Sequence, residues 1–195
     1  MSVTSAEPVV FATAVEGTRK AYARRFTPEL RAELKALGMD LEAIQAAYPL
    51  NTWLAAARLM GRAFFPELEE AERQRQLGRE FMKGYVQTAI GFATLTTAKL
   101  IGVKRTLLRM GRNFRTAANY IEVDVLDVGP REVHLRAQVG EEFMPRVGPA
   151  ANDIILHYRR GVLEETLVLL GVTGTVDVLE APAQRPGGLF RITWS

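Results

Sequence analysis

The stretch NYIEVDVLDVGPREVHLRAQV, residues 119–139, decides the fold. In its first half Ile121 and Val123 alternate with charged residues, and apolar and polar residues alternate again in its second half. Gly129-Pro130 separates the two halves, and this pair of residues is typical of a turn. Alternation with a period of two is typical of strands that bury one face. The stretch therefore predicts two antiparallel strands within residues 118–139.

On the N-terminal side of this hairpin, the apolar residues recur with helical spacing. Thr27 and Pro28 mark the start of a helix that Gly38 ends. Asn51 is placed to cap a second helix, which ends before Pro66 because proline disfavours helix at the residue that it follows. The N-terminal part is therefore expected to be helical.

A long helix is predicted from Pro66 to about Ile101. A short strand at residues 9–13 and a short helix from Asp40 to Tyr48 are predicted before it. One face of the long helix is marked by residues that recur with helical period, namely Leu77, Phe81, Tyr85, Thr88, Phe92 and Leu95. This spacing indicates the central helix of the fold.

On the C-terminal side, one more helix and one more hairpin are predicted. The helix covers residues 152–170, with Asn152 or Asp153 as its cap and Gly171 as its end, and the hairpin covers residues 174–194. The chain is then a single α+β domain over residues 1–195. Its helix-rich N-terminal half (14–117) packs on a small antiparallel sheet that helices cover on one side, together with the long C-terminal helix.

Composition excludes several kinds of chemistry. The net charge of +3, from 25 Lys and Arg against 22 Asp and Glu, is a small surplus and makes nucleic acid an unlikely partner. The absence of cysteine excludes disulfides, thiolate metal sites and cysteine nucleophiles. With neither a leader sequence nor a run long enough to span a bilayer, the chain is expected to be cytoplasmic without a transmembrane segment.

No pattern of catalytic or metal-ligating residues stands out. His134 and His157 both fall on polar faces, and no metal-binding spacing surrounds them. The acidic pairs Glu69-Glu70, Glu141-Glu142 and Glu164-Glu165 are expected to be solvated, because adjacent side chains point in different directions. We therefore predict no catalytic residues, no metal, no cofactor and no enzymatic activity.

Residues 103–116 predict an amphipathic helix with one basic face. Val103, Leu107, Met110 and Phe114 lie on its apolar arc. The opposite arc carries Lys104, Arg105, Arg109, Arg112 and Arg115. A solvated helix face explains these charges, and the alternative is that the five residues bind a polyanion, either nucleic acid or an anionic membrane surface.

The long helix also offers a candidate ligand site. Gly78, Gly84 and Gly91 interrupt its aromatic stripe, and each interior glycine costs about 1 kcal/mol relative to alanine. Close packing against a neighbouring element would explain these glycines, and a small-molecule cavity beside the helix is the functional alternative. The ligand-binding residues predicted there are Phe81, Tyr85, Thr88 and Phe92.

Several stretches resemble a known family. LKALGMDLEAIQAAYPLNTW, FFPELEEAERQRQLGREFMKGYVQTAIG, RMGRNFRTAANYIEV and RRGVLEETLVLLG are similar to a myxobacterial paralogous family of uncharacterised single-domain proteins. More distantly, the order of elements and the closing hairpin resemble four-vinyl-reductase sensor domains, haem-nitric-oxide-binding domains and TRAPP subunits. This resemblance implies a ligand-holding or protein-docking module that self-associates. Haem, zinc and covalent lipid are not carried over, since no haem-ligating histidine can be placed and cysteine is absent.

The sequence thus predicts a non-catalytic cytoplasmic sensor or adaptor. It is expected to bind a small apolar ligand, a protein partner or both, and to form a homodimer. Polyanion binding through the basic face of residues 103–116 remains the alternative.

Overall fold

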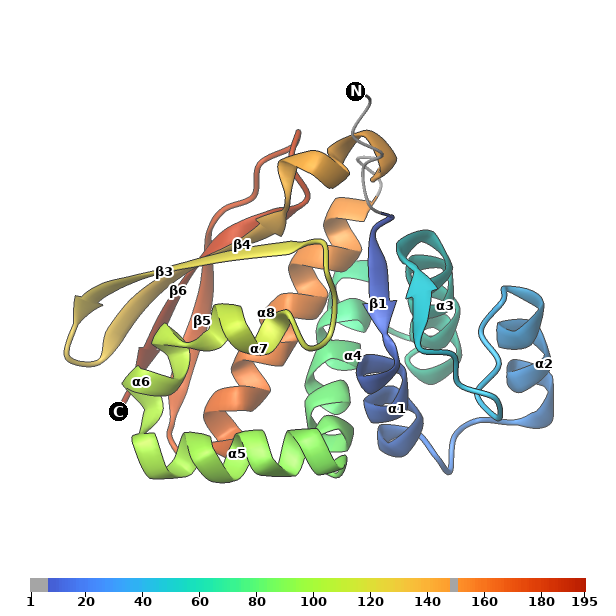
Figure 1. Cartoon of the computed structure of the whole chain (residues 1–195), viewed down its shortest axis with the longest axis horizontal. Coiled ribbons are helices and arrows are strands. Elements are labelled where there is room, and N and C mark those ends of the chain that lie inside the picture. The colour runs from blue at the N-terminus through green and yellow to red at the C-terminus, as the bar shows by residue number, and fades with distance from the viewer. Residues whose placement is uncertain (1–6, 148–150) are drawn as a thin grey trace.

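The hairpin predicted from residues 119–139 forms half of a four-stranded antiparallel sheet in the computed structural model (Figure 1), which describes residues 7–147 and 151–195. Strands β3 (Ile121–Gly129) and β4 (Glu132–Val139) make this hairpin. Strands β5 (Gly174–Glu180) and β6 (Gly187–Trp194) make the predicted C-terminal one. The order across the sheet is β3-β4-β6-β5. Both predicted hairpins are confirmed.

One face of this sheet is covered by helices. The residues of β4 alternate as predicted, because Val133 and Leu135 are fully buried while His134 and Arg136 lie half-buried on the other face. The buried residues pack against α8 (Asn152–Leu169), which lies behind the sheet in Figure 1. The α+β class, with helices on one side of an antiparallel sheet, is therefore confirmed.

Helix α8 ends where the sequence predicts, but it begins without the predicted side-chain cap. Gly171 ends it in the left-handed region at φ +78°, as predicted. The predicted cap is wrong, since the N-cap position is Ala151 and no side chain caps it. Asn152 instead accepts a hydrogen bond from the backbone N–H of Gly187 at 3.0 Å, which joins the start of α8 to the start of β6.

The helical half contains four helices and a small two-stranded sheet before residue 86. These elements are β1 (Val9–Phe11), α1 (Ala12–Ala21), α2 (Pro28–Ala36), β2 (Ala47–Pro49), α3 (Leu50–Phe64) and α4 (Glu70–Tyr85). Thr27 caps α2 as predicted, because its hydroxyl accepts from the Leu30 N–H at 3.2 Å. The predicted helix from Asp40 to Tyr48 is wrong, since that segment ends in β2, which pairs with β1. Asn51 is not a cap, because α3 already begins at Leu50.

The predicted long helix from Pro66 to Ile101 is wrong. It is divided into α4 and α5 (Ala89–Ile101), which meet at a turn. Thr88 makes this turn, because its hydroxyl accepts from the Gly91 N–H at 3.0 Å and donates to the Tyr85 carbonyl at 2.8 Å. In Figure 1, α5 consequently runs across the lower ends of α4 and α8.

The basic segment is also divided. The helix predicted over residues 103–116 consists of α6 (Val103–Leu108) and α7 (Met110–Phe114), with Arg109 between them. Its apolar arc is placed as predicted, since Leu107 and Met110 are buried and Phe114 is half-buried. The basic residues therefore face outward from two short helices rather than from one long one.

Helices α4 and α8 cross at two glycines. A Cβ atom on Gly78 would lie 2.0 Å from the backbone oxygen of Tyr158, and one on Gly161 would lie 1.9 Å from that of Arg75. Gly84 likewise allows α1 to approach, since its Cβ would lie 2.1 Å from the Gly17 oxygen. The sequence left two explanations for these glycines, close packing and a ligand cavity. Close packing explains Gly78 and Gly84.

Ion pairs line the edges of the same crossing. Arg75 Nε lies 2.7 Å from Glu164 Oε2, and Arg79 Nε lies 3.2 Å from Glu165 Oε2. Glu165 is only 2% exposed. The expectation that this acidic pair is solvated is wrong, because both carboxylates face arginines of α4.

The core consists of two apolar clusters rather than one. One lies among the N-terminal helices and β1, and the other lies between the sheet, α6 and α8. Phe114 and Val123 pack against both clusters. The helical half and the sheet therefore meet along a seam at these two residues, and an apolar cavity lies at this seam.

Candidate ligand cavity

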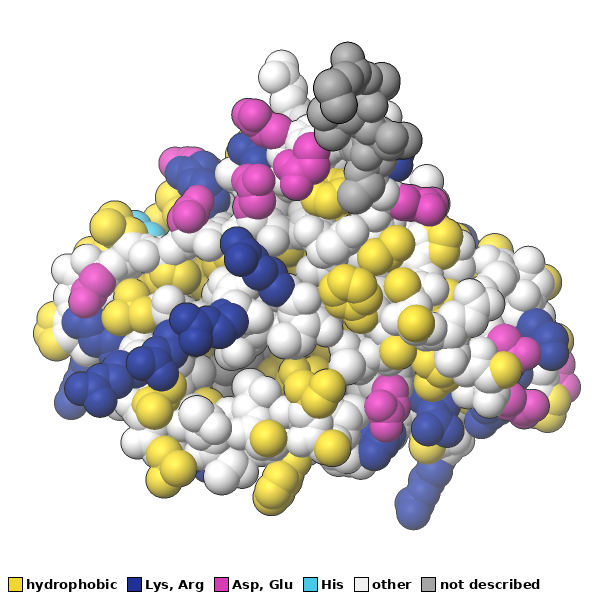
Figure 2. All heavy atoms as spheres, in the orientation of Figure 1, with side chains coloured by type: hydrophobic (Ala, Val, Ile, Leu, Met, Phe, Trp, Pro, Cys, Tyr) yellow, Lys and Arg dark blue, Asp and Glu magenta, His cyan; other side chains and the backbone are white. Residues whose placement is uncertain are grey.

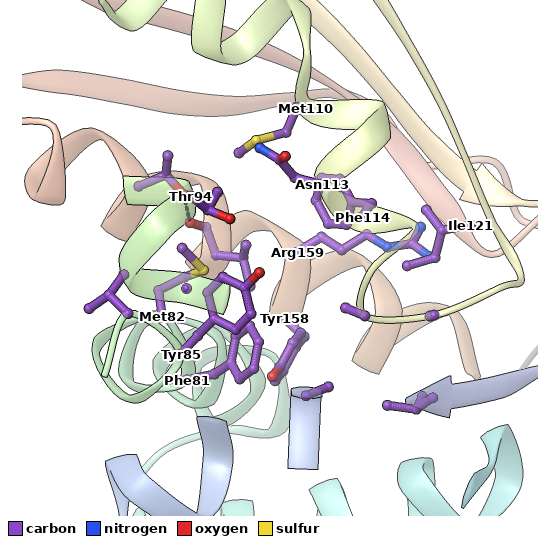
Figure 3. Close-up of a pocket in the computed structure, with 18 of the residues that line it drawn as sticks. Phe81, Met82, Tyr85, Thr94, Met110, Asn113, Phe114, Ile121, Tyr158 and Arg159 are labelled. Carbon is purple, nitrogen blue, oxygen red and sulfur yellow. Dashed lines mark hydrogen bonds between the residues drawn. The ribbon is translucent and has the colours of Figure 1, made fainter. Parts of the chain in front are cut away.

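An apolar cavity of about 120 Å³ lies between the two halves of the fold. Figure 3 shows side chains of α4, α5, α7 and α8 converging on it, with Ile121 at the start of β3 beside them. Almost all of its wall is aliphatic or aromatic. A cavity with such a lining binds apolar molecules, since an engineered apolar cavity of about 150 Å³ takes up benzene or xenon.

Aromatic side chains from three helices form one end of the cavity. The Phe81 ring lies 5.6 Å from that of Tyr85 and 5.8 Å from that of Tyr158, measured between centroids. Trp53 of α3 meets Tyr158 edge to face at 5.9 Å. The crossing of α4 and α8 at Gly78 brings these rings together. This end therefore offers ring faces and edges to an aromatic or aliphatic guest.

One charged side chain lies in this apolar wall. Arg159 of α8 is 3% exposed, and in Figure 3 it runs beneath Phe114 toward Ile121. Its Nη1 donates to the backbone oxygen of Ala137 at 3.0 Å, and its guanidinium lies 6.0 Å from the centre of the Tyr120 ring. Nη2 is buried and has no hydrogen-bond partner among the described residues. Burial lowers the pKa of Arg159 from its ordinary value.

The four predicted ligand-binding residues are placed differently from one another. Phe81 and Tyr85 line the cavity. Thr88 is buried but lies outside the lining, where it makes the turn before α5, and Phe92 is 67% exposed on the outer side of α5. Because the break at Thr88 redirects the chain, Thr94, rather than Phe92, faces the cavity from α5. Ligand contact by Phe81 and Tyr85 stays a prediction.

Sequence reasoning missed the contribution of α8. Tyr158 and Arg159 line the cavity although the sequence analysis assigned neither to a site. A signal was present, because Arg159 lies four residues after Ile155 and three before Val162, on the apolar side of its helix. A charged residue at such a position indicates a buried polar site.

The five predicted anion-binding residues lie along α6 and α7, where Figure 2 shows a band of Lys and Arg side chains. Lys104 pairs with Asp127 at 2.8 Å. Arg105, Arg109, Arg112 and Arg115 lie on the outer side of the two helices. Arg109 and Arg112 line a second, more open hollow of about 300 Å³ that shares Thr94, Ala98, Thr106 and Asn113 with the apolar cavity. The basic band thus adjoins the side of the cavity that opens between α5 and α7.

Comparison with solved structures identifies the class of fold. A variant of Tt H-NOX has a TM-score of 0.62 at 13% identity, covering 94% of this chain and 92% of that one. An unliganded Fe(II) H-NOX variant from K. algicida gives 0.62 at 10% identity, with 95% and 96% covered. An oxygen-binding H-NOX domain related to soluble guanylate cyclases gives 0.57 at 14% identity, with 94% and 92% covered. The protein therefore has the H-NOX fold.

Within this class, the chain belongs to the family described as "Protein of unknown function (DUF2378)", whose sequence profile matches residues 8–195. This assignment agrees with the resemblance to an uncharacterised family of single-domain proteins. None of the curated protein sequences matches this chain. Among the described residues no helix combines the length and the apolar character that crossing a membrane requires.

Haem, which H-NOX domains hold, does not fit the residues of this cavity. Haem iron takes a protein ligand such as His, Cys, Met or Tyr. The lining has no histidine, because His134 and His157 lie elsewhere in the described structure, and the chain has no cysteine. Met82 and Met110 of the lining therefore lack the histidine with which a methionine shares the iron. Burial raises the pKa of the Tyr158 hydroxyl well above its ordinary value, which opposes a phenolate ligand. The volume of about 120 Å³ is comparable to the roughly 150 Å³ of a cavity that takes up benzene, and a porphyrin is several times larger than benzene.

Proposed function

We propose that this protein is a non-catalytic sensor or adaptor that holds a small apolar molecule in the cavity between its helical half and its sheet. The observation that carries the proposal is an apolar cavity of about 120 Å³ lined by aromatic side chains. Burying a guest of roughly benzene size there removes apolar surface from water, which favours binding by roughly 25 cal/mol per Å².

Helix α5 supplies a way for the ligand to be sensed. Only Gly91 and Ala98 of α5 are buried, although nine of the 13 residues of the helix are apolar. Ile90 is 47% exposed and Leu100 is 83% exposed. Figure 2 shows hydrophobic side chains along the lower edge of the molecule, where α5 lies in Figure 1. Since Thr94 and Leu95 line the cavity, a ligand would contact α5 directly and shift the position of its outer face.

The outer face of α5 supports the second part of the proposal, which is a protein partner. An apolar helix face in contact with water is a feature of interaction sites. The partner that we propose is a second copy of the chain, bound in the cytoplasm. Ligand binding and homodimer formation would then be two linked equilibria. Polyanion binding by the basic band gains no support from the fold or from the comparisons, and we do not propose it.

A thermal-shift titration with a neutral apolar probe tests the proposed function. Benzyl alcohol is expected to raise Tm, because ligand at 100 times its Kd stabilises the folded state by about 2.7 kcal/mol. Leu95→Trp places an indole in the cavity and should abolish the shift. Leu100→Trp adds the same group on the same helix at an exposed position and should preserve it. No shift with benzyl alcohol or with any other probe of similar size would contradict the proposal.

A further inference from the structure

We infer that the ligand is an organic anion, an apolar carboxylic acid of roughly benzoate size, whose carboxylate pairs with Arg159 at the seam. This inference rests on the proposed function and adds the chemical class of the ligand. It starts from Nη2 of Arg159, a buried donor that lacks a partner among the described residues of a cavity wall.

A buried arginine needs an anion more than other cationic residues do. Its side chain stays protonated under all ordinary conditions, whereas a buried lysine can lose its proton. A buried charge without a partner is strongly destabilising. Burial accordingly lowers the pKa of Arg159, but an arginine remains cationic after such a shift.

The protein itself supplies no such anion. Arg159 forms no ion pair with the described carboxylates, and its guanidinium contacts the Ala137 oxygen and the Tyr120 side chain, through both the ring and the hydroxyl. The remaining residues, 1–6 and 148–150, contain no Asp or Glu. The Tyr120 hydroxyl is a poor substitute, because burial raises its pKa and keeps it neutral. The missing partner must therefore come from outside the chain.

The shape of the site fits a carboxylate with an apolar body. In Figure 3 the Arg159 side chain leaves α8 and runs beneath Phe114 toward Ile121, away from the rings of Phe81 and Tyr158. A group that pairs with Nη2 would thus be joined to a hydrophobic part that extends along Phe114 toward those rings. A carboxylate suits a guanidinium because planar, charge-assisted hydrogen bonds form between them.

A route for an anion is also present. Arg109 and Arg112 line the hollow that adjoins the cavity through Asn113 and Thr94. A group of charges of one sign near an opening raises the local concentration of a ligand of the opposite charge and speeds its association. These two arginines would attract the ligand, and Arg159 would hold it.

The experiment compares benzoate with benzyl alcohol at pH 7, since the two share a ring and a carbon count and differ in charge. Affinities are measured by calorimetry on the full chain. The unmodified protein should bind benzoate at least about tenfold more tightly, which is the scale of a hydrogen bond to a charged group. Arg159→Met should remove this preference while benzyl alcohol still binds. The preference is a ratio of affinities, so a general loss of packing would not by itself change it.

Arg112→Met is the matched control, because it removes a cation from the mouth and leaves the cavity wall intact. It should lower the association rate at low salt and leave the benzoate preference within about twofold. Equal affinities for the two probes in the unmodified protein would overturn the inference and leave the proposed function standing. Loss of the preference in Arg112→Met but not in Arg159→Met would overturn the inference as well. Binding of neither probe would instead contradict the proposed function.

If Arg159→Met does not fold, Arg159→Lys provides the second variant. Lysine keeps the charge but lacks the planar fork, so benzoate should bind several-fold more weakly while remaining preferred over benzyl alcohol. An unchanged benzoate affinity in Arg159→Lys would overturn the assignment.

Discussion

The crossing of α4 and α8 at Gly78 yields a quantitative prediction for Gly78→Ala. The new Cβ would lie 2.0 Å from the Tyr158 oxygen and 3.1 Å from the Val162 nitrogen. Both atoms belong to the backbone of α8, so no side chain can rotate away. The two helices must separate by about 1.4 Å before the contact becomes ordinary, so the overpacking cost lies at the upper end of the usual range, at about 3 kcal/mol.

Two opposing effects set the net magnitude of Gly78→Ala. Alanine stabilises a helix interior by about 1 kcal/mol relative to glycine, which offsets part of the clash. We expect a net loss of about 2 kcal/mol in the free energy of unfolding. For a chain of this length, each kcal/mol lowers Tm by about 2–4 °C, so the expected decrease is about 4–8 °C. Benzyl alcohol should also bind more weakly, because Tyr158 and Phe81 move apart.

Gly129→Ala is the control for this measurement. Its Cβ would come no closer than 4.0 Å to the Glu132 Cβ, and the backbone φ of Gly129 is not positive. Its free energy of unfolding should stay within about 0.5 kcal/mol of that of the unmodified protein, which is typical of substitutions without a steric consequence. Urea unfolding of both variants checks the difference. A Gly78→Ala protein as stable as the unmodified one would refute the close crossing.

Three further predictions concern α5, the ion pairs and pH. Thr88→Ala removes the N-cap of α5, so it should cost about 1 kcal/mol and raise hydrogen exchange in α5 before other helices, whereas Thr88→Ser should not. Arg79→Met leaves the buried Glu165 carboxylate without its cation and should cost about 1.5–3 kcal/mol, and combining it with Glu165→Met should recover part of this loss in urea unfolding. Burial is the largest cause that lowers the pKa of His157 in the folded protein, so the unfolded chain binds a proton at His157 more readily than the folded chain does. The contribution of His157 to the free energy of unfolding is therefore present above about pH 6.5 and is lost as pH falls below it. His157→Gln should reduce that loss between about pH 6.5 and 5, and an identical slope would contradict the assignment.

The sheet was predictable from the sequence because its signals are local. Alternation in residues 119–139 places Val133 and Leu135 inside, and both are buried. Gly171 marks the end of α8 because few other residues adopt its positive φ. These features depend on neighbouring residues alone, and each was confirmed.

The break between α4 and α5 could not be predicted in the same way. Thr88 fits the helical repeat that runs from Leu77 to Leu95, and it is also an ordinary capping residue. Only the tertiary structure decides between these roles, because α5 must turn to lie across α4 and α8. The misplacement of Phe92 follows from this single error, since its direction depends on the helix that carries it.

The cavity itself depends on side chains that are distant in the sequence. Phe81, Phe114 and Arg159 come from three helices, and the spacing along any one of them contains no information about the gap between them. The aromatic stripe of α4 led to the two residues of that helix that lie at the cavity. Arg159 could not be predicted from apolar spacing, because that spacing identifies the buried face of α8 and does not identify a charged residue that interrupts it.

A crystal of the protein equilibrated under xenon tests the central claim most directly. Xenon enters apolar cavities of this size and is located by its electron density. The account predicts a xenon site at the seam, bounded by Phe81, Tyr85 and Phe114. A seam filled by these side chains, or xenon bound only elsewhere, would contradict it.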